Sequence, residues 1–435
     1  MLTTQDLHPL ATELTAMPPA DTESDAIDRL TLLETIKAAA TAAQARDTAR
    51  LDELRCADEE QRKVPKSRRG RGLAAEVGLA RKASPQKGAQ YLGFARALVH
   101  EMPHTRSRLA TGELTEWRAT ILVRETAYLT RESREEIDRR MCADTDTLDG
   151  MSDRQVEATA KAHAYELEPR AVVARGAKAT KDRRVSTRPA PDLMTSVTAL
   201  LPMAQGISVY AALKQHADSI VGGDERTRDQ IMADTLVERV TGQATAEAVP
   251  VAVDVVISVS ALLGGSEEPA HVPGHGTIPA QIAREMIAAG LVDEAEAHST
   301  LRRLFARPAD GALVSMESAA RAFPKSLAHF ITVRDRYCRT PYCGATIAEI
   351  DHARPHHDGG ETSARNADGT CRIHNRAKEM SGWHYRTVDT RTGHLLETIT
   401  PTGHAHRSSA PAVVGHHPAT VSRVENRLLA LLNAA

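Results

Sequence analysis

Two short stretches near the C-terminus decide the fold expected for that part of the chain. The first is Ile350-Asp351-His352-Ala353-Arg354-Pro355, and the second is Cys371-Arg372-Ile373-His374-Asn375-Arg376-Ala377-Lys378. Asn366 lies between them, and Cys338 and Cys343 precede both. An Asp-His pair and two asparagines thus stand inside a frame of soft metal ligands. A candidate base beside oxygen ligands is a combination that phosphodiester hydrolysis can use.

The frame consists of two close ligand pairs, Cys338-x4-Cys343 and Cys371-x2-His374. A proline and a glycine favour a turn around the first pair, and residues three apart share a face at the start of a helix. Four ligands of the Cys3His type form a closed zinc site, which is structural and not catalytic. Because the segment between the pairs is too short to bury a core, we expect zinc to hold it together. The other interpretation is three buried thiols and a surface histidine.

The enclosed polar residues have the chemistry that phosphodiester cleavage requires. His352 is suited to be the general base near neutral pH, and Asp351 is a hard oxygen ligand suited to magnesium or manganese. The amide oxygen of Asn375 could reach the same ion. Asn366 could bond the loop that carries His352 and fix the imidazole. The neighbouring histidines 356 and 357 leave the identity of the base open, and a zinc-stabilised binding module remains the other interpretation.

Cations that could contact phosphates lie in two places. Arg376 and Lys378 follow Asn375 on the same expected helix. Residues 62–71 hold six cations, among them Arg68, Arg69 and Arg71. Since the net charge of the chain is only −2, a protein that binds DNA must concentrate its positive charge locally. A solvated basic loop is the commoner role of such a run.

Length and composition limit the class of protein. A chain of 435 residues predicts two or three domains. No stretch approaches the roughly 18 apolar residues of a membrane span, and residues 1–6 do not resemble a secretion signal, so we expect no membrane partner and a cytoplasmic location. Three of the five cysteines lie in the motif region, which favours metal binding in a reducing compartment over disulfides. The oligomeric state is not indicated.

The sequence predicts a mainly α-helical N-terminal region with a short β element, followed by a small C-terminal module. The expected segments are a flexible N-terminus over 1–23, a helical domain over 24–310, the module over 325–390, a flexible tail over 400–418 and a last helix over 419–435.

Helical spacing of apolar residues is clear over 25–55. The β element is expected as a hairpin of 183–188 with 195–201 and a buried strand over 249–259. Helices over 73–83 and 86–100 meet at Ser84-Pro85, and they are either packed bundle helices or a DNA-reading helix-turn-helix. Trp117 is expected to anchor a core.

Residues 331–385 resemble HNH endonucleases of the ββα-metal class. The matching elements are Arg334-Asp335-Arg336-x-Cys338-Arg339-x-Pro341-x-Cys343, Ile350-Asp351-His352, Pro355, Gly359-Gly360-x-Thr362, Asn366, Cys371-x-x-His374-Asn375-x-x-Lys378 and Gly382-Trp383. The upstream region resembles the helical domain of unknown function that precedes HNH modules in many actinobacterial proteins. Its marks are LATGELTEWRA at 109–119, DERTRDQ at 224–230 with Ala233-Asp234, and GTIP at 276–279.

The resemblance implies a zinc-stabilised ββα-metal module that hydrolyses DNA with a divalent metal and leaves 5′-phosphate and 3′-hydroxyl ends. It implies His352 as general base, Asp351 and Asn375 as magnesium ligands, and Asn366 as the residue that orients the base. Two positions depart from the family, which often has Cys at the place of His374 and has His at the place of Asn375. The alternative is a nucleic-acid-binding or regulatory protein with an inactive HNH-type zinc module.

Overall fold

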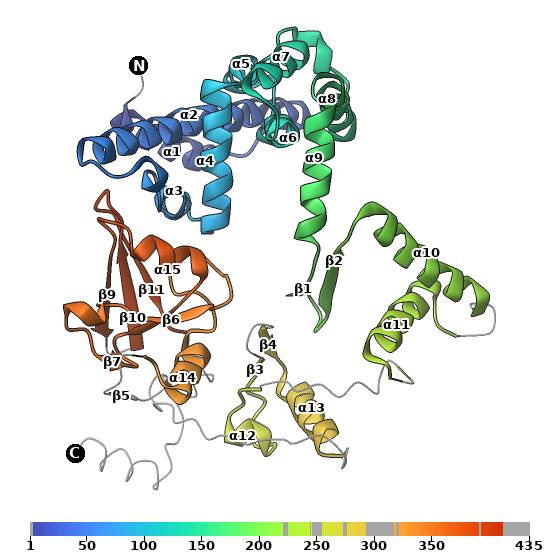
Figure 1. Ribbon diagram of the computed structural model, residues 1–435, viewed down its shortest axis with the longest axis vertical. Coiled ribbons are helices and arrows are strands. Elements are labelled where there is room, and N and C mark those ends of the chain that lie inside the picture. The colour runs from blue at the N-terminus through green and yellow to red at the C-terminus, as the bar shows by residue number, and fades with distance from the viewer. Residues whose placement is uncertain are drawn as a thin grey trace. The chain divides into compact units, whose positions relative to one another are not determined.

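The computed structural model describes most of the chain (Figure 1). The chain divides into two compact units. One unit comprises residues 1–70 and 89–175, and the other comprises 71–88 and 176–435. The described residues are 3–220, 225–243, 245, 255–272, 276–292, 317–318, 322–390 and 393–411.

The first unit is helical. Its elements are α1 Thr4–Ala16, α2 Glu23–Gln61, η1 Lys66–Arg68, α5 Pro103–Thr111, α6 Glu116–Thr126, α7 Arg131–Cys142, η2 Thr145–Leu148 and α8 Asp153–Leu167, with most of α4 Pro85–His100 and α9 Pro169–Ala179. Side chains at the N-caps, such as those of Thr115 and Ser152, accept hydrogen bonds from the first turns of α6 and α8. Leu98, Leu109 and Ile137 are fully buried in its core.

Two expectations for this unit are corrected by the structure. Residues 4–16 form the helix α1, capped by Thr3 and Asp6, where a loose segment was expected. Trp117 was expected in a core but is 54% exposed. It lies in the first turn of α6, whose buried face is formed by residues such as Ala119 and Leu122. The helix expected over 25–55 is confirmed by α2.

The second unit mixes short sheets with helices. Its described elements before residue 317 are α3 Leu73–Ala80, η3 Thr180–Asp182, β1 Arg184–Pro189, β2 Thr195–Leu200, α10 Met203–Ile220, α11 Arg228–Thr241, α12 Val259–Leu262, β3 Ala270–Val272, β4 Gly276–Ile278 and α13 Ala280–Val292. The pairing of β1 with β2 confirms the expected hairpin. Most of the strand expected over 249–259 lies outside the described residues, and Val256 forms only an isolated bridge with His271.

The C-terminal elements are β5 Glu317–Ser318, α14 Lys325–Asp335, β6 Glu349–His352, η4 His356–Asp358, β7 Thr362–Ser363, β8 Ala367–Thr370, α15 Arg372–Lys378, β9 His384–Thr390, β10 Gly393–Ile399 and β11 Ala405–Ser409. Strand β6 pairs antiparallel with β8, and α15 follows. Strands β11, β10 and β9 form a separate sheet in that order. Leu327, Phe330 and Ile331 of α14 pack beside Ala367 of β8.

The ordered structure continues past the expected module boundary at 390. Residues 405–409, which were expected in a flexible tail, form β11 and pair with β10. The pairing gives this segment main-chain hydrogen bonds to β10 along one edge. A composition of His, Pro, Gly and Ser does not predict such pairing. The helix expected over 419–435 lies outside the described residues. Among the described residues, no helix combines the length and apolar character needed to span a bilayer.

Helix α3 packs against α15 and the residues after it instead of being exposed for DNA reading. Ala75 and Leu79 of α3 join Ala377, Trp383 and Leu396 in one buried cluster, and most residues of α3 are buried. The carboxylate of Glu76 also accepts hydrogen bonds from the backbone and hydroxyl of Thr402. These contacts favour the packing interpretation of this helix over the helix-turn-helix.

The close approach of α3 to the start of α4 depends on Gly88. A Cβ atom at this position would lie 2.0 Å from the Ala74 carbonyl oxygen and 2.7 Å from the Gly78 nitrogen. We therefore expect Gly88→Ala to destabilise the protein by about 1–3 kcal/mol, the usual cost of overpacking. Gly93→Ala in the same helix is the matched control, because nothing lies within 4 Å of its added Cβ, and it should gain up to about 1 kcal/mol of helix propensity. Denaturant unfolding measures both, and equal effects would contradict this role of Gly88.

Candidate metal centre and hydrolytic site

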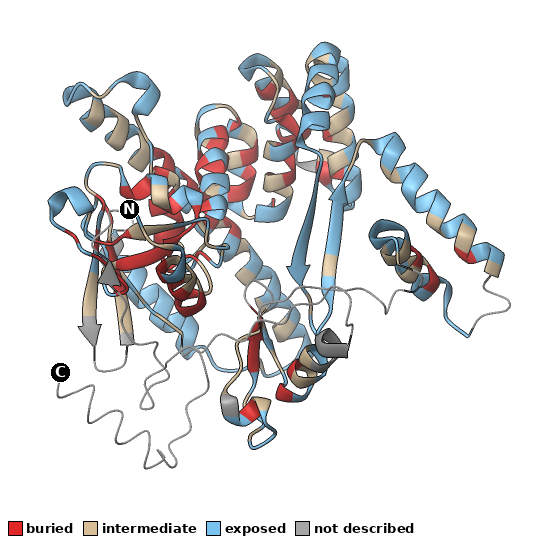
Figure 2. Cartoon of the chain, turned by 60° about the horizontal axis from the view of Figure 1, so that its bottom comes forward, coloured by how far each residue is buried: buried red, intermediate tan, exposed pale blue. Residues whose placement is uncertain are grey.

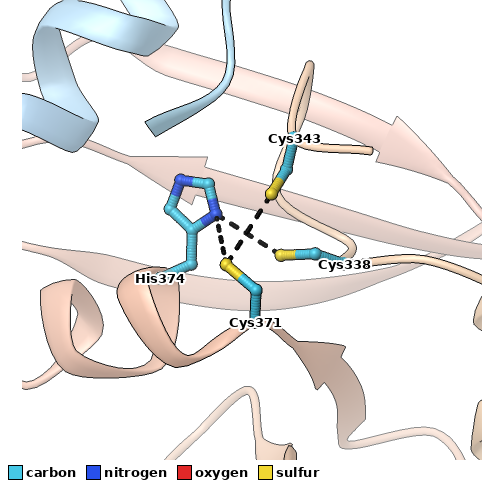
Figure 3. Close-up of side chains that lie close together, drawn as sticks. All are labelled: Cys338, Cys343, Cys371 and His374. Atoms are coloured by element: carbon cyan, nitrogen blue, oxygen red, sulfur yellow. Dashed lines mark hydrogen bonds between the residues drawn. The ribbon is translucent and has the colours of Figure 1, made fainter. Parts of the chain in front are cut away.

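Four side chains converge to form a possible metal centre (Figure 3). Their ligand atoms all lie within 4.8 Å of one another, and all four residues are buried. Cys338 Sγ is 3.4 Å and Cys371 Sγ 3.6 Å from His374 Nδ1, and Cys343 Sγ is 3.7 Å from Cys371 Sγ. The structure therefore brings together all four predicted ligands.

These separations fit a tetrahedral zinc ion. With Zn–S bonds of about 2.3 Å and Zn–N bonds of about 2.0 Å, two sulfurs lie about 3.8 Å apart, and a sulfur and a nitrogen about 3.5 Å apart. The three separations given above agree with these sulfur–sulfur and sulfur–nitrogen distances within a few tenths of an ångström. The cluster could hold a metal such as zinc, and its four ligands would close the coordination sphere.

Local backbone geometry positions the ligands. Tyr342 and Gly344 on either side of Cys343 adopt positive φ angles of 62° and 59°, which turn the chain back so that the N–H of Cys338 bonds the carbonyl of Ala345. Cys371 is the N-cap residue of α15, so His374 lies one turn further along the same helix. The turn expected around the first ligand pair and the helix start expected at the second are both present.

The contacts among the thiols shift their pKa values in opposite directions. Hydrogen bonds from the Cys338 and Cys343 thiols lower the pKa of the Cys371 thiol. The hydrogen bonds that the Cys338 thiol makes with Cys343 and Cys371 raise the pKa of Cys338. The thiolate is the form of cysteine that ligates a metal ion. Without a metal ion the cluster favours a single thiolate, and binding of a metal ion would release protons.

Asp351 and His352 lie at the end of β6 on a cleft of about 630 Å³. The cleft is also lined by Phe323, His356 and His357 among others. His352 Nε2 lies 2.9 Å from the Thr362 hydroxyl, and its ring packs against Phe323 with centroids 4.5 Å apart. These two contacts hold the imidazole, and the residue is 7% exposed.

Asn366 binds the loop that follows His352. Its side-chain oxygen accepts from the N–H of Arg354, and its amide donates to the carbonyls of Arg354 and Glu361. Gly360 makes this arrangement possible, because a Cβ there would lie 1.9 Å from the Arg354 carbonyl oxygen. The structure therefore contains the expected hydrogen bonds between Asn366 and the loop that follows His352.

Helix α15 runs along β6, so that two polar pairs form between them. Asn375 donates its amide to Glu349, and Lys378 Nζ lies 2.8 Å from Asp351 Oδ2. Glu349 and Asp351 are two residues apart and therefore share one face of the strand. The Asn375 side-chain oxygen is buried and has no hydrogen-bond partner. The Asn375 side chain therefore brings a hard oxygen without a donor close to the Glu349 carboxylate that its amide contacts.

Asp368 is a buried carboxylate directly opposite Asp351 in the β6–β8 register. It is fully buried, burial raises the pKa of its carboxyl to about 6, and neither of its oxygens accepts a hydrogen bond. Lys378 Nζ lies 3.8 Å from one of them. Lys378 thus bridges two facing carboxylates, which would otherwise repel each other across the strand pair.

The expected phosphate-binding cations are found in different settings. Lys378 is 9% exposed and pairs with Asp351, so the structure differs from the expectation that it faces phosphates. Arg69 pairs with Glu60 and bonds the Val64 carbonyl, which makes it part of a loop structure. Arg68, Arg71 and Arg376 are exposed, and their contact with nucleic acid stays a prediction.

Sequence reasoning missed three side chains of this region. Glu349 could have been found, because side chains two residues apart in a strand share a face and Glu349 lies two residues before Asp351. Thr362 belongs to the segment that resembles HNH endonucleases, but the sequence predicted no role for it. Asp368 gave no local signal, because its place opposite Asp351 depends on the strand register.

The comparisons with known proteins bear on the upstream region. A family model described as Domain of unknown function (DUF222) matches residues 29–335. The match begins inside the region expected over 24–310 and continues to the end of α14, just before Cys338. No curated protein and no solved structure matches the chain.

Proposed function

The chain belongs to the DUF222 family, the N-terminal domain common to actinobacterial HNH proteins, and from this premise we propose that it is a metal-dependent endonuclease that hydrolyses DNA. The observation that carries the proposal is the joint placement of Asp351 and His352 on one cleft beside the Cys3His cluster. The strand–strand–helix order of β6, β8 and α15 supports an HNH module of the ββα-metal class. The family's description names no activity, so the proposal rests on the C-terminal residues.

In the proposed reaction His352 is the base. When Nε2–H is donated to the Thr362 hydroxyl, Nδ1 is the nitrogen that can accept the proton of the attacking water. Asn366 keeps the loop after β6 in place, and the packing of Phe323 fixes the plane of the ring. The base therefore needs no reorientation before attack.

The residues present also fit a divalent cation. Asp351 and the Asn375 side-chain oxygen, with Glu349 beside them, would hold magnesium or manganese. When bound, such an ion supplies charge neutralisation at the phosphate and at the leaving oxygen. The four-ligand centre would hold zinc for a structural purpose, joining the turn at Cys343 to the first turn of α15.

One observation favours the alternative of a nucleic-acid-binding or regulatory protein with an inactive module. Lys378 already neutralises Asp351, the carboxylate that a catalytic cation needs. The two functions differ in a simple test. An endonuclease cleaves duplex DNA with magnesium or manganese and stops when EDTA is added, whereas an inactive module binds the same DNA and leaves it intact under both conditions. Cleavage that is unchanged by EDTA would contradict the proposal.

The role of Lys378 can be tested without measuring cleavage. Lys378→Met leaves Asp351 and Asp368 without their shared cation, so we expect a loss of about 3–5 kcal/mol of stability in the absence of divalent metal. Magnesium or manganese should restore part of that loss, and the metal-dependent rise in Tm should exceed that of the wild type. Arg376→Met on the exposed side of α15 is the matched control. Equal metal-dependent shifts in Tm for both variants would contradict a cation site at Asp351.

A further inference from the structure

The second unit carries a concentrated basic segment that the proposed site does not use. Residues 176–188 contain five cations and one acidic residue, Asp182. The cations are Lys178, Lys181, Arg183, Arg184 and Arg188. None of the five is buried. The side chains of Arg183 and Arg184 donate to the backbone carbonyls of Thr180 and Asp182, respectively, and these bonds leave their charge uncompensated.

The same segment leads into a two-stranded ribbon whose faces differ. Directly opposed residues share a face, so the register places Arg184, Ser186 and Arg188 beside Leu200, Thr198 and Ser196. The opposite face carries Val185, Thr187, Val197 and Ala199. One face is therefore basic and rich in hydroxyl groups, and the other is mostly apolar.

The ribbon is exposed on both faces (Figure 2). Every residue of β1 is exposed, and only one residue of β2 is half-buried. Val185 and Val197 on the apolar face are 68% and 59% exposed. A lone two-stranded ribbon is marginally stable in water. Its strands and side chains are thus available to a partner along their whole length.

The basic loop over 62–71 offers a useful contrast. There Arg62 pairs with Asp58 and Arg69 with Glu60, so neighbouring acids neutralise part of its charge. The ribbon segment has five cations to one acid, and its arginines contact only backbone carbonyls in the described hydrogen bonds. Charge complementarity therefore favours the ribbon over the loop as the polyanion contact.

We propose that the β1–β2 ribbon binds duplex DNA through its basic face, with Arg184 and Arg188 contacting backbone phosphates. The major groove of B-DNA is wide enough for a two-stranded ribbon, and arginine, serine and threonine are common phosphate-binding side chains. This inference rests on the proposed function, since it supplies the substrate contact that the buried Lys378 does not provide. The proposed ligand is duplex DNA, and the proposed contacts are with its phosphates.

The test uses the full chain carrying His352→Ala, so that the DNA stays intact. Affinity for a short duplex is measured by fluorescence anisotropy over a range of salt concentrations, with and without Arg184→Gln and Arg188→Gln. Each phosphate contact adds about 0.9 to the slope of log affinity against log salt, so the double substitution should reduce that slope by about 2. The matched control is Lys37→Gln with Arg50→Gln, two exposed cations that pair with Glu34 and Glu53 in α2. The control removes the same charge and should leave the slope unchanged.

An unchanged slope and affinity in the ribbon variant, with circular dichroism and zinc content like the parent, would overturn the proposal. A change in oligomeric state with an unchanged slope would also overturn it, because the ribbon would then join copies of this chain. The same substitutions in the wild-type background separate this inference from the proposed function. Magnesium-dependent cleavage with no ribbon effect refutes only the ribbon, and ribbon-dependent binding without any cleavage refutes only the nuclease.

Discussion

Replacing His352 by alanine is expected to slow DNA cleavage by about 10²–10⁴-fold while leaving DNA affinity unchanged, because a general base acts on the water and not on binding. The structure supports this choice of base among the three neighbouring histidines. His352 is buried, contacts Thr362 and packs on Phe323, whereas His356 and His357 are exposed residues of η4. Initial rates at saturating magnesium, with binding measured separately, give the comparison.

His356→Ala and His357→Ala are the matched controls for this prediction. Both histidines line the same cleft, so each substitution removes an imidazole from the same surroundings. We expect each to retain most of the wild-type rate. If either control loses activity while His352→Ala cleaves normally, the base is a different histidine and the mechanism must be reassigned.

Loss of the metal centre should have the largest effect on stability. Zinc-finger peptides gain about 10–16 kcal/mol from zinc at neutral pH, so Cys371→Ser should remove bound zinc and unfold the elements around β6, β8 and α15 first. Among the described residues, Ala345 is the one further apolar residue packed on the three thiols, so little apolar contact holds the turn at Cys343 against the start of α15 without a metal ion. Elemental analysis and thermal unfolding of protein purified without added metal would show both changes.

Cys56→Ser is the control for the zinc prediction, because Cys56 is a half-buried thiol of α2 outside the cluster. It should keep one zinc per chain and the wild-type unfolding curve. A wild-type protein without zinc whose C-terminal region is nevertheless well folded would contradict the structural role of the metal.

The sequence predicted the zinc ligands because their positions depend on short spacings and on one turn and one helix start. It also predicted the contact of Asn366 with the loop after His352, which the structure shows as three hydrogen bonds. The long helix α2 followed from the spacing of its apolar residues. In each case the information lies within a few turns of chain or in a pattern that repeats along it.

What the sequence did not predict depends on contacts between distant segments. The link from Lys378 to both Asp351 and Asp368 needs the strand register and the path of α15. The packing of Leu79 beside Trp383 joins residues about three hundred positions apart, so no local pattern could reveal it. Strand β11 was missed because edge pairing, and not composition, gives that segment its structure.

The most direct test of the central claim is the fate of a supercoiled plasmid and the chemistry of its ends. Zinc-loaded wild-type protein with magnesium should convert the plasmid to nicked or linear forms, and EDTA should prevent this. Hydrolysis with 5′-phosphate and 3′-hydroxyl products predicts that DNA ligase reseals the nicks without prior end repair. A zinc-loaded, folded protein that binds the plasmid but produces no magnesium-dependent, ligatable breaks would contradict the account.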